Sequence, residues 1–285
     1  MEKHPINLIT ATAKQHALLL QYPNQPRRRL VLLHGAGVPG EVTWTYLANY
    51  LQGWDEVLVV DLAGMGQSHF LNTETPSIPD YQRQVAELLC ALDWTQYDIA
   101  GYSFGGMVAI ALLNSLDRFQ GRCFLLEPAM LLASQPELLQ RKADEYRALA
   151  VGIQQQPDHE AHYRHFLNSV SPNRLPDERS EKLTLRRLRQ FAPGFSQALL
   201  AVSDVLEQQQ HTLVQWRSPW PGMSFVGELS SAHMHLRHQQ LAEQSEYWRY
   251  VNVPNADHSL VFSKPRFIAQ AMSSFVSDVA SPFPP

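Results

Sequence analysis

The stretch GYSFGG, residues 101–106, decides the fold of this chain. It places three glycines and one serine where an apolar run around Ile99 ends and a largely apolar helical segment begins at Phe104. Glycine weakens both strands and helices, so its concentration here indicates a turn too tight for larger side chains. The first five residues fit G-x-S-x-G in the strand-to-helix context that this motif requires. We interpret Ser103 as a nucleophile held at the apex of the turn, against the alternative of an ordinary glycine-rich turn.

Apolar runs on both sides of this turn alternate with helical patterns. Residues 30–33, 57–60 and 123–126 are continuously apolar. Such strands, separated by helices, predict a parallel sheet covered on both faces, which is an α/β fold. Ligands of these sheets bind beyond the carboxyl ends of the strands. Four residues with reactive or polar side chains follow the predicted strands at these ends: His34, Asp61, Ser103 and Glu127.

The pattern changes between residues 129 and 221, where only helical periodicity remains. Tyr163, Phe166, Leu167 and Val170 recur at the spacing of one helix face. Strand character returns at 223–226 and 250–253. The sequence therefore predicts a core made of residues 1–128 and 222–285, with residues 129–221 inserted as a helical cap. We expect this cap to roof a mostly apolar pocket over Ser103.

Composition bounds the class of protein. Of the 285 residues, 45% are hydrophobic and 18% are charged, which excludes a disordered chain. The formal net charge is -4 and no long run of like charge occurs, so neither nucleic acid nor an anionic membrane is an expected partner. No secretory or membrane-spanning segment is apparent, and Cys90 and Cys123 are interpreted as buried, reduced thiols. We expect a cytoplasmic monomer or homodimer.

A serine nucleophile needs a base and a site for the developing oxyanion. His258 follows the last predicted strand, so it lies at the same sheet end as Ser103 and is the expected base. The backbone N–H groups of Ala36, in a glycine-bracketed turn, and of Phe104, at a helix start, are the expected oxyanion donors. His34 is expected to order the first of these turns, with a direct catalytic role as the alternative.

Taken together, these motifs resemble the α/β-hydrolase superfamily. The resemblance is to the capped branch that includes esterases, carbon–carbon bond hydrolases, haloalkane dehalogenases and cofactor-free haloperoxidases. It implies Ser103 as nucleophile, His258 as base, Ala36 and Phe104 as oxyanion donors, no cofactor or metal, and a structural role for Asp61. The matching stretches are LVLLHGAG (30–37), VVDLAGMGQS (59–68), IAGYSFGG (99–106), LLEPA (125–129) and NADHS (255–259).

The chain departs from the pattern of this family at the acidic residue that orients the catalytic histidine. Most members carry an aspartate in a pattern close to G-x-x-D, but here residues 227–230 read GELS and place Ser230 at that position. Serine cannot hold the charge that steadies an imidazolium. Glu127 at the preceding strand end is the favoured replacement, as in some dehalogenases of similar fold. Glu228 and the absence of a working acid remain alternatives.

The predicted activity is hydrolysis of a small carboxylic ester or thioester through an acyl-enzyme. A serine at position 103 excludes the dehalogenase reaction, which in that family uses an aspartate nucleophile. The alternatives are a carbon–carbon bond hydrolase with the same triad and a receptor-like binder without catalysis. The histidine-rich tract at 233–238 lacks cysteine or acidic ligands and is expected to be a surface helix, so no metal site is predicted.

Overall fold

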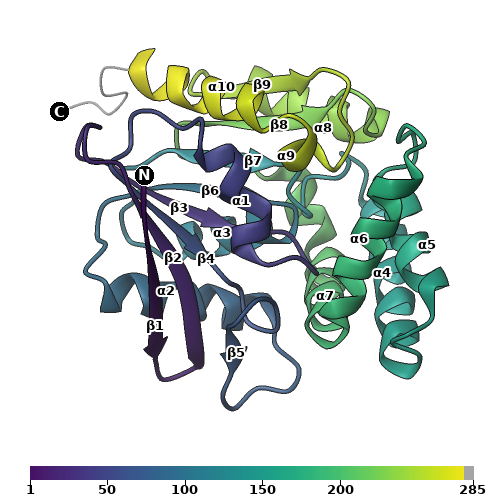
Figure 1. Cartoon of the computed structure of the whole chain (residues 1–285). Helices are drawn as coiled ribbons and strands as arrows, with labels where there is room; N and C mark the ends of the chain where they lie inside the picture. Colours follow the sequence, from purple (N-terminus) through teal and green to yellow (C-terminus); the bar gives the residue numbers. More distant parts are fainter. Residues whose placement is uncertain (279–285) are drawn as a thin grey trace.

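The computed structural model describes residues 1–278, so the last part of the predicted core, 279–285, lies outside the described residues. The strands are β1 (Glu2–Ile9), β2 (Ala13–Gln21), β3 (Arg29–Leu33), β4 (Glu56–Val60), β5 (His69–Phe70), β6 (Asp98–Tyr102), β7 (Cys123–Leu126), β8 (Gly222–Gly227) and β9 (Trp248–Val253). They form one sheet in the order β1-β2-β4-β3-β6-β7-β8-β9, with β5 paired to β2 (Figure 1). The pairs from β4 to β9 are parallel, and β2 pairs antiparallel with its neighbours.

Helices cover both faces of the sheet because its inner strands are apolar on both sides. Leu30 and Leu32 of β3 belong to the hydrophobic cluster that holds Trp44, whereas Val31 and Leu33 belong to the other cluster. The first cluster is completed by α1, α9 and α10, and the second by α2 and α3. The helices are α1 (Gly40–Ala48), α2 (Ile78–Ala91), α3 (Phe104–Asn114), α4 (Pro136–Gln155), α5 (Glu160–Val170), α6 (Glu178–Gln190), α7 (Ala192–Gln215), α8 (Ala232–Glu243), α9 (Leu260–Ser263) and α10 (Pro265–Asp278).

Four helices, α4 to α7, lie between β7 and β8 and are called the helical insertion below. They gather on one side of the sheet in Figure 1. Pro136 and Pro193 lie in the first turns of α4 and α7, where the N–H that proline lacks would have no acceptor within the helix. The insertion contacts the core closely at Gly194, where an added Cβ would lie 2.0 Å from the carbonyl oxygen of Gly64. The insertion therefore packs directly on the loop after β4.

The tract at 233–238 lies on a surface helix, as the sequence predicts, but one face of that helix is buried. In α8, His233 and Leu236 are exposed, whereas Arg237 and His238 are 1% and 0% exposed. The Arg237 guanidinium donates to the carbonyl oxygens of Leu213 and Trp216 at the end of α7, so this face packs where the insertion rejoins the core. One expectation from the sequence is wrong: Cys90 is exposed on α2, whereas Cys123 is buried.

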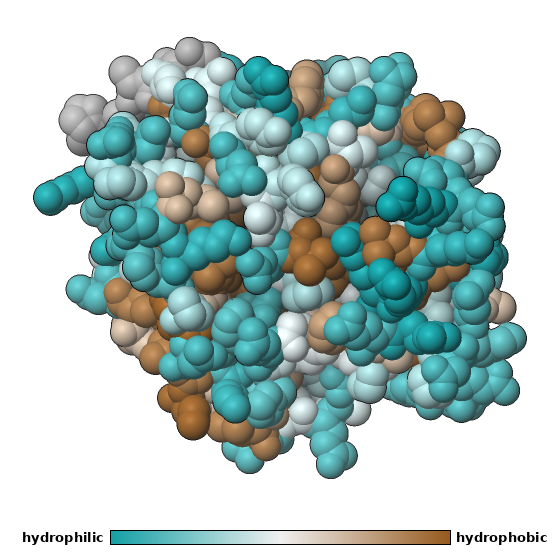
Figure 2. Space-filling view, in the orientation of Figure 1, coloured by the Kyte–Doolittle hydropathy of each residue, from teal (hydrophilic) through white to brown (hydrophobic). Residues whose placement is uncertain are grey.

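On the face shown in Figure 2, hydrophobic side chains form separate patches among hydrophilic ones. Within residues 1–278, none of the helices combines the length and apolar character needed to cross a membrane.

Candidate active site

Ser103 lies at a strained turn between β6 and α3. Its backbone has φ 51° and ψ -115°, a left-handed conformation that a residue with a side chain rarely adopts. An added Cβ on Gly101 would lie 2.5 Å from the carbonyl oxygen of Gly105. An added Cβ on Gly105 would lie 2.3 Å from the carbonyl oxygen of Leu33. The glycines are therefore required by the close approach of β6, α3 and β3, and the turn presents the Ser103 hydroxyl at the sheet end.

Three side chains from separate strand ends form a hydrogen-bonded chain. Ser103 Oγ lies 3.1 Å from His258 Nε2, and His258 Nδ1 lies 2.7 Å from Glu127 Oε2. Glu127 is 0% exposed and His258 is 8% exposed. Because a carboxylate only accepts hydrogen bonds, Nδ1 carries the proton and Nε2 is left to accept from the serine hydroxyl. This arrangement fits nucleophile, base and orienting acid.

The structure distinguishes between the two candidate acids. Glu127 follows β7 with φ 42°, and its Oε1 accepts from the Gly227 N–H at 2.7 Å and from the Ser230 hydroxyl at 2.6 Å. Glu228 is exposed, and its Oε2 accepts from the backbone N–H of Asn255 at 2.7 Å. The geometry thus brings Glu127, and not Glu228, to the imidazole. Ser230, at the position of the expected aspartate, contacts the carboxylate from the far side.

The two expected oxyanion donors are free to bind a ligand. Among residues 1–278, neither the Ala36 N–H nor the Phe104 N–H has a hydrogen-bond acceptor. Phe104 is the first residue of α3, so the helix dipole also favours negative charge there. These features match the two donors that an oxyanion requires.

His34 orders the turn that carries Ala36. Its Nδ1–H donates to the Gly35 carbonyl oxygen at 2.7 Å, and its Nε2 accepts from the Leu62 N–H at 2.8 Å. Burial lowers the pKa of His34, so the ring stays neutral with both nitrogens engaged. It contacts the loops rather than the serine, which leaves it no proton-transfer role.

Asp61 holds the loop after β4. Its carboxylate accepts from the backbone N–H groups of Gly40 at 2.8 Å and Gln67 at 3.0 Å. It also lies 2.9 Å from His16 Nδ1. Asp61 thus stabilises the rim of the site without contacting the Ser103–His258 pair.

Two cavities meet at Ser103 and His258. The α6-side cavity, of about 260 Å³, lies among the end of α5, α6 and the loop between β9 and α9. The α4-side cavity, of about 390 Å³, lies among α4, the end of α5 and the loop after β8. Val170, the last residue of α5, lines both cavities. The serine is therefore open to two compartments.

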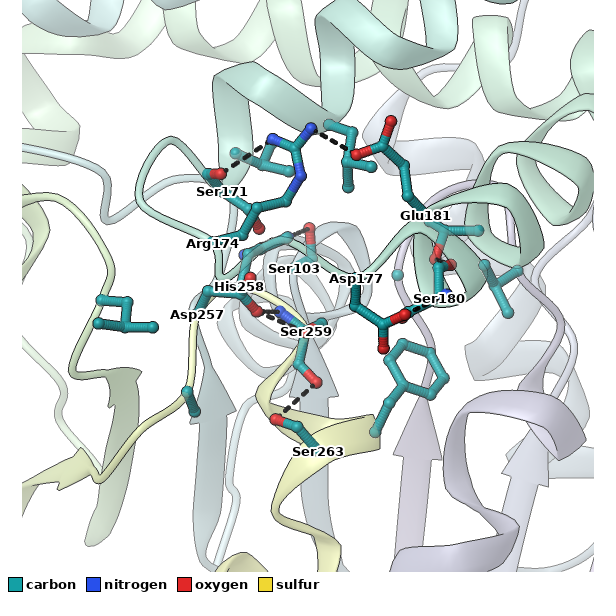
Figure 3. A pocket seen from close by; sticks show the side chains of 18 of the residues that line it. Ser103, Ser171, Arg174, Asp177, Ser180, Glu181, Asp257, His258, Ser259 and Ser263 are labelled. Carbon is teal, nitrogen blue, oxygen red and sulfur yellow. Dashed lines mark hydrogen bonds and ion pairs between the residues drawn. The ribbon is translucent and has the colours of Figure 1, made fainter.

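The lining of both cavities is mostly apolar, as the sequence predicts, but charged side chains also reach it. In the α6-side cavity the Arg174 guanidinium pairs with Glu181 at 3.0 Å, and Figure 3 shows this pair across the cavity from Ser259 and Ser263. The α4-side cavity is lined by Arg141, Lys142 and His233 besides its apolar residues. Helical periodicity reveals the apolar stripe of a helix, but it does not show which charged residues at the edge of that stripe face inward.

Comparisons with known proteins place the chain in a family. Residues 30–271 match the model of the Alpha/beta hydrolase family. Over 192 residues the chain is 31% identical to 2-succinyl-6-hydroxy-2,4-cyclohexadiene-1-carboxylate synthase of Yersinia pestis (strain Pestoides F), covering 65% of this chain and 68% of that protein. The chain therefore belongs to the alpha/beta hydrolase family of enzymes.

Solved structures show the same fold at lower identity. A thermophilic esterase from Thermogutta terrifontis superposes with a TM-score of 0.69 and 18% identity, over 98% of this chain and 99% of the esterase. A haloalkane dehalogenase loop variant from Bradyrhizobium elkanii gives a TM-score of 0.73 and 13% identity, over 97% and 96% of the two chains. These likenesses support the α/β-hydrolase fold that the sequence predicts.

Proposed function

We propose that this protein is a serine hydrolase that cleaves small carboxylic esters or thioesters through an acyl-enzyme. One observation carries the proposal: the continuous series of hydrogen bonds from Glu127 through His258 to Ser103, with distances of 2.7 and 3.1 Å. It lies at a strained turn, beside two backbone N–H groups that have no acceptor among residues 1–278. Strained backbone persists where the surrounding structure enforces it, and it is common at catalytic sites. A receptor-like binder would not require these linked hydrogen bonds.

In the proposed mechanism, Ser103 Oγ attacks the substrate carbonyl carbon while His258 Nε2 takes the hydroxyl proton. The N–H groups of Ala36 and Phe104 donate to the oxyanion of the tetrahedral intermediate. The Glu127 carboxylate keeps the imidazole in the required tautomer and stabilises it when it is charged. His258 then gives the proton to the leaving oxygen or sulfur, and a water activated by the same ring hydrolyses the acyl-enzyme.

We further propose that the helical insertion acts as the cap of this site. Residues of the insertion line both cavities, and the two cavities meet at Ser103. A bound ester has an acyl arm and a leaving-group arm on either side of its carbonyl carbon. Two compartments of about 260 and 390 Å³ suit two short arms, one in each cavity. The substrate class is therefore a small two-armed ester or thioester rather than a polymer.

A second candidate function follows from the relative in Yersinia pestis, whose name describes formation of a succinyl-bearing carboxylate. A carboxylate-bearing substrate needs cationic partners, and Arg141 and Lys142 line the α4-side cavity. Lys142 is engaged by Glu145 and Ser169, each at 2.7 Å, whereas the Arg141 side chain has no hydrogen-bond or ion-pair partner among residues 1–278. On this alternative the same serine and histidine would serve a non-hydrolytic reaction.

The test is a panel of short acyl p-nitrophenyl esters and acyl thioesters, assayed with the wild-type protein and with Ser103→Ala. Turnover that disappears in Ser103→Ala supports the hydrolase. A folded wild-type protein that turns over none of the panel, but forms the named cyclohexadiene carboxylate from its precursor, favours the second candidate.

A further inference from the structure

The Glu127 carboxylate has two oxygens, and only one of them faces the histidine. Oε2 contacts His258 Nδ1, while Oε1 accepts two hydrogen bonds, from the Gly227 N–H and from the Ser230 hydroxyl. Both oxygens of a carboxylate that is 0% exposed are thus satisfied. A buried carboxylate oxygen without such partners is costly, so each donor is important for keeping the Glu127 side chain in place.

Of the two donors, the Gly227 N–H is fixed by the end of β8, and its Cα leaves no room for a side chain. An added Cβ there would lie 2.6 Å from the Ala256 carbonyl oxygen and 2.7 Å from that of Asp257, in the loop that carries His258. The other donor, the Ser230 hydroxyl, belongs to a side chain and can be removed by substitution. The backbone N–H of Ser230 bonds to the Gly227 carbonyl oxygen at 2.9 Å, which holds the hydroxyl towards Glu127.

We propose that Ser230 is a positioning residue of the active site: its hydroxyl anchors Oε1 of Glu127 so that Oε2 stays aimed at His258 Nδ1. This inference rests on the proposed function. It gives a reason for the departure at position 230, where the family pattern has aspartate. A carboxylate there would face Glu127 at hydrogen-bond distance, and two like charges so close cannot both be ionised. An acid at the end of β7 and a neutral donor at position 230 therefore form a matched pair.

The hydrogen bond from Ser230 also restricts the motion of the Glu127 side chain. Its side chain leaves a residue with φ 42°, at the point where β7 gives way to the helical insertion. The loop after β8 is itself tied to the histidine loop, since the Leu229 N–H donates to the Ala256 carbonyl oxygen at 2.8 Å. Ser230 thus connects the acid to the same loop that carries the base. Loss of its hydroxyl is expected to loosen the acid without removing any group that touches substrate.

The experiment is a double-mutant cycle on ester hydrolysis with Ser230→Ala, Glu127→Gln and the combined variant, each checked for folding by circular dichroism. Ser230→Ala should lower kcat by about tenfold, the size expected for one hydrogen bond to a buried charge, with KM nearly unchanged. In the Glu127→Gln background it should cause little further loss, because the carboxylate charge and the His258 tautomer that Ser230 helps to maintain are already lost. Ser230→Thr, which keeps the hydroxyl, should restore kcat.

Ser224→Ala is the matched control. Ser224, like Ser230, is a buried serine, but it lies within β8, and its hydroxyl accepts from Trp248 Nε1 at 3.2 Å and does not contact Glu127, His258 or Ser103. Its kcat should equal that of the wild type. An unchanged kcat in Ser230→Ala overturns the proposal, and so does an equal loss in both backgrounds. A wild-type protein without any ester or thioester turnover overturns the proposed function itself, and the proposal with it.

Discussion

Replacing Glu127 by glutamine tests whether Glu127 is the catalytic acid, because the substitution changes only one carboxylate oxygen, which becomes an NH2 group. The two donors at Oε1, the Gly227 N–H and the Ser230 hydroxyl, require an acceptor at that position. The amide oxygen of glutamine must therefore take the place of Oε1, which turns its NH2 group towards His258 Nδ1. That ring nitrogen then has to accept, so the proton moves to Nε2. In this tautomer Nε2 cannot take the proton of Ser103.

The size of the effect follows from this geometry. The variant loses both the correct tautomer and the charge that stabilises the imidazolium, while the side-chain volume and both Oε1 contacts are kept. In serine proteases a wrong tautomer of this kind lowers kcat by about 10⁴-fold, or roughly 5.4 kcal/mol of transition-state stabilisation. We expect Glu127→Gln to lower kcat by about 10³- to 10⁴-fold, with little change in KM.

The assay is steady-state hydrolysis of the best ester or thioester of the panel, with thermal melts to show that the fold survives. Glu228→Gln is the matched control, because Glu228 is exposed and its acceptor role towards the Asn255 N–H can be kept by an amide oxygen. It should retain nearly full activity. A loss of less than about tenfold in Glu127→Gln, or a larger loss in Glu228→Gln, refutes the assignment of the acid.

Three further predictions concern the frame of the site. Gly105→Ala should destabilise the fold by about 2 kcal/mol or more in denaturant titrations, because its Cβ would lie 2.3 Å from the Leu33 carbonyl oxygen; unchanged stability contradicts the tight turn. Val170→Trp should alter the acyl-length preference of the ester panel, since Val170 lines both cavities, whereas Val151→Trp on the exposed side of α4 should not; identical profiles argue against the two-compartment substrate. The free energy of unfolding should fall as the pH drops below about 6.5, because burial lowers the pKa of His238 to about 3 and the unfolded chain takes up a proton that the folded chain does not. His238→Leu should flatten this slope by up to about 1.4 kcal/mol per pH unit in melts between pH 7 and 4, and an unaltered slope excludes His238 as the cause.

Local patterns were sufficient to predict the core of the fold. Continuous apolar runs such as 30–33 become strands whose alternate residues face two different clusters, as a sheet covered on both faces requires. The glycines around Ser103 predicted the tight turn, since their spacing reflects steric contacts within a few residues and with the adjacent strand. In both cases the cause is short-range, so it is visible in the sequence.

The surroundings of the triad depend on contacts that no local pattern encodes. Glu127 could be favoured as the acid from its place at a strand end, but the donation from Ser230, 103 positions later, arises only when β7 and β8 pair. The burial of His238 was missed for the same reason, because α8 has no clear apolar stripe and is covered by the end of the helical insertion. Which charged residues join the mostly apolar lining of the two cavities likewise depends on how α4 to α6 are oriented over the sheet.

The most direct test of the central claim is covalent labelling of the wild-type protein with a fluorophosphonate, followed by intact mass measurement and peptide mapping. An activated serine reacts with such a probe, whereas an ordinary serine hydroxyl does not. We predict a single adduct on the peptide that contains Ser103, no adduct in Ser103→Ala, and much slower labelling in Glu127→Gln. A folded wild-type protein that never acquires the adduct, or that carries it on a different residue, contradicts the assignment of Ser103 as the nucleophile.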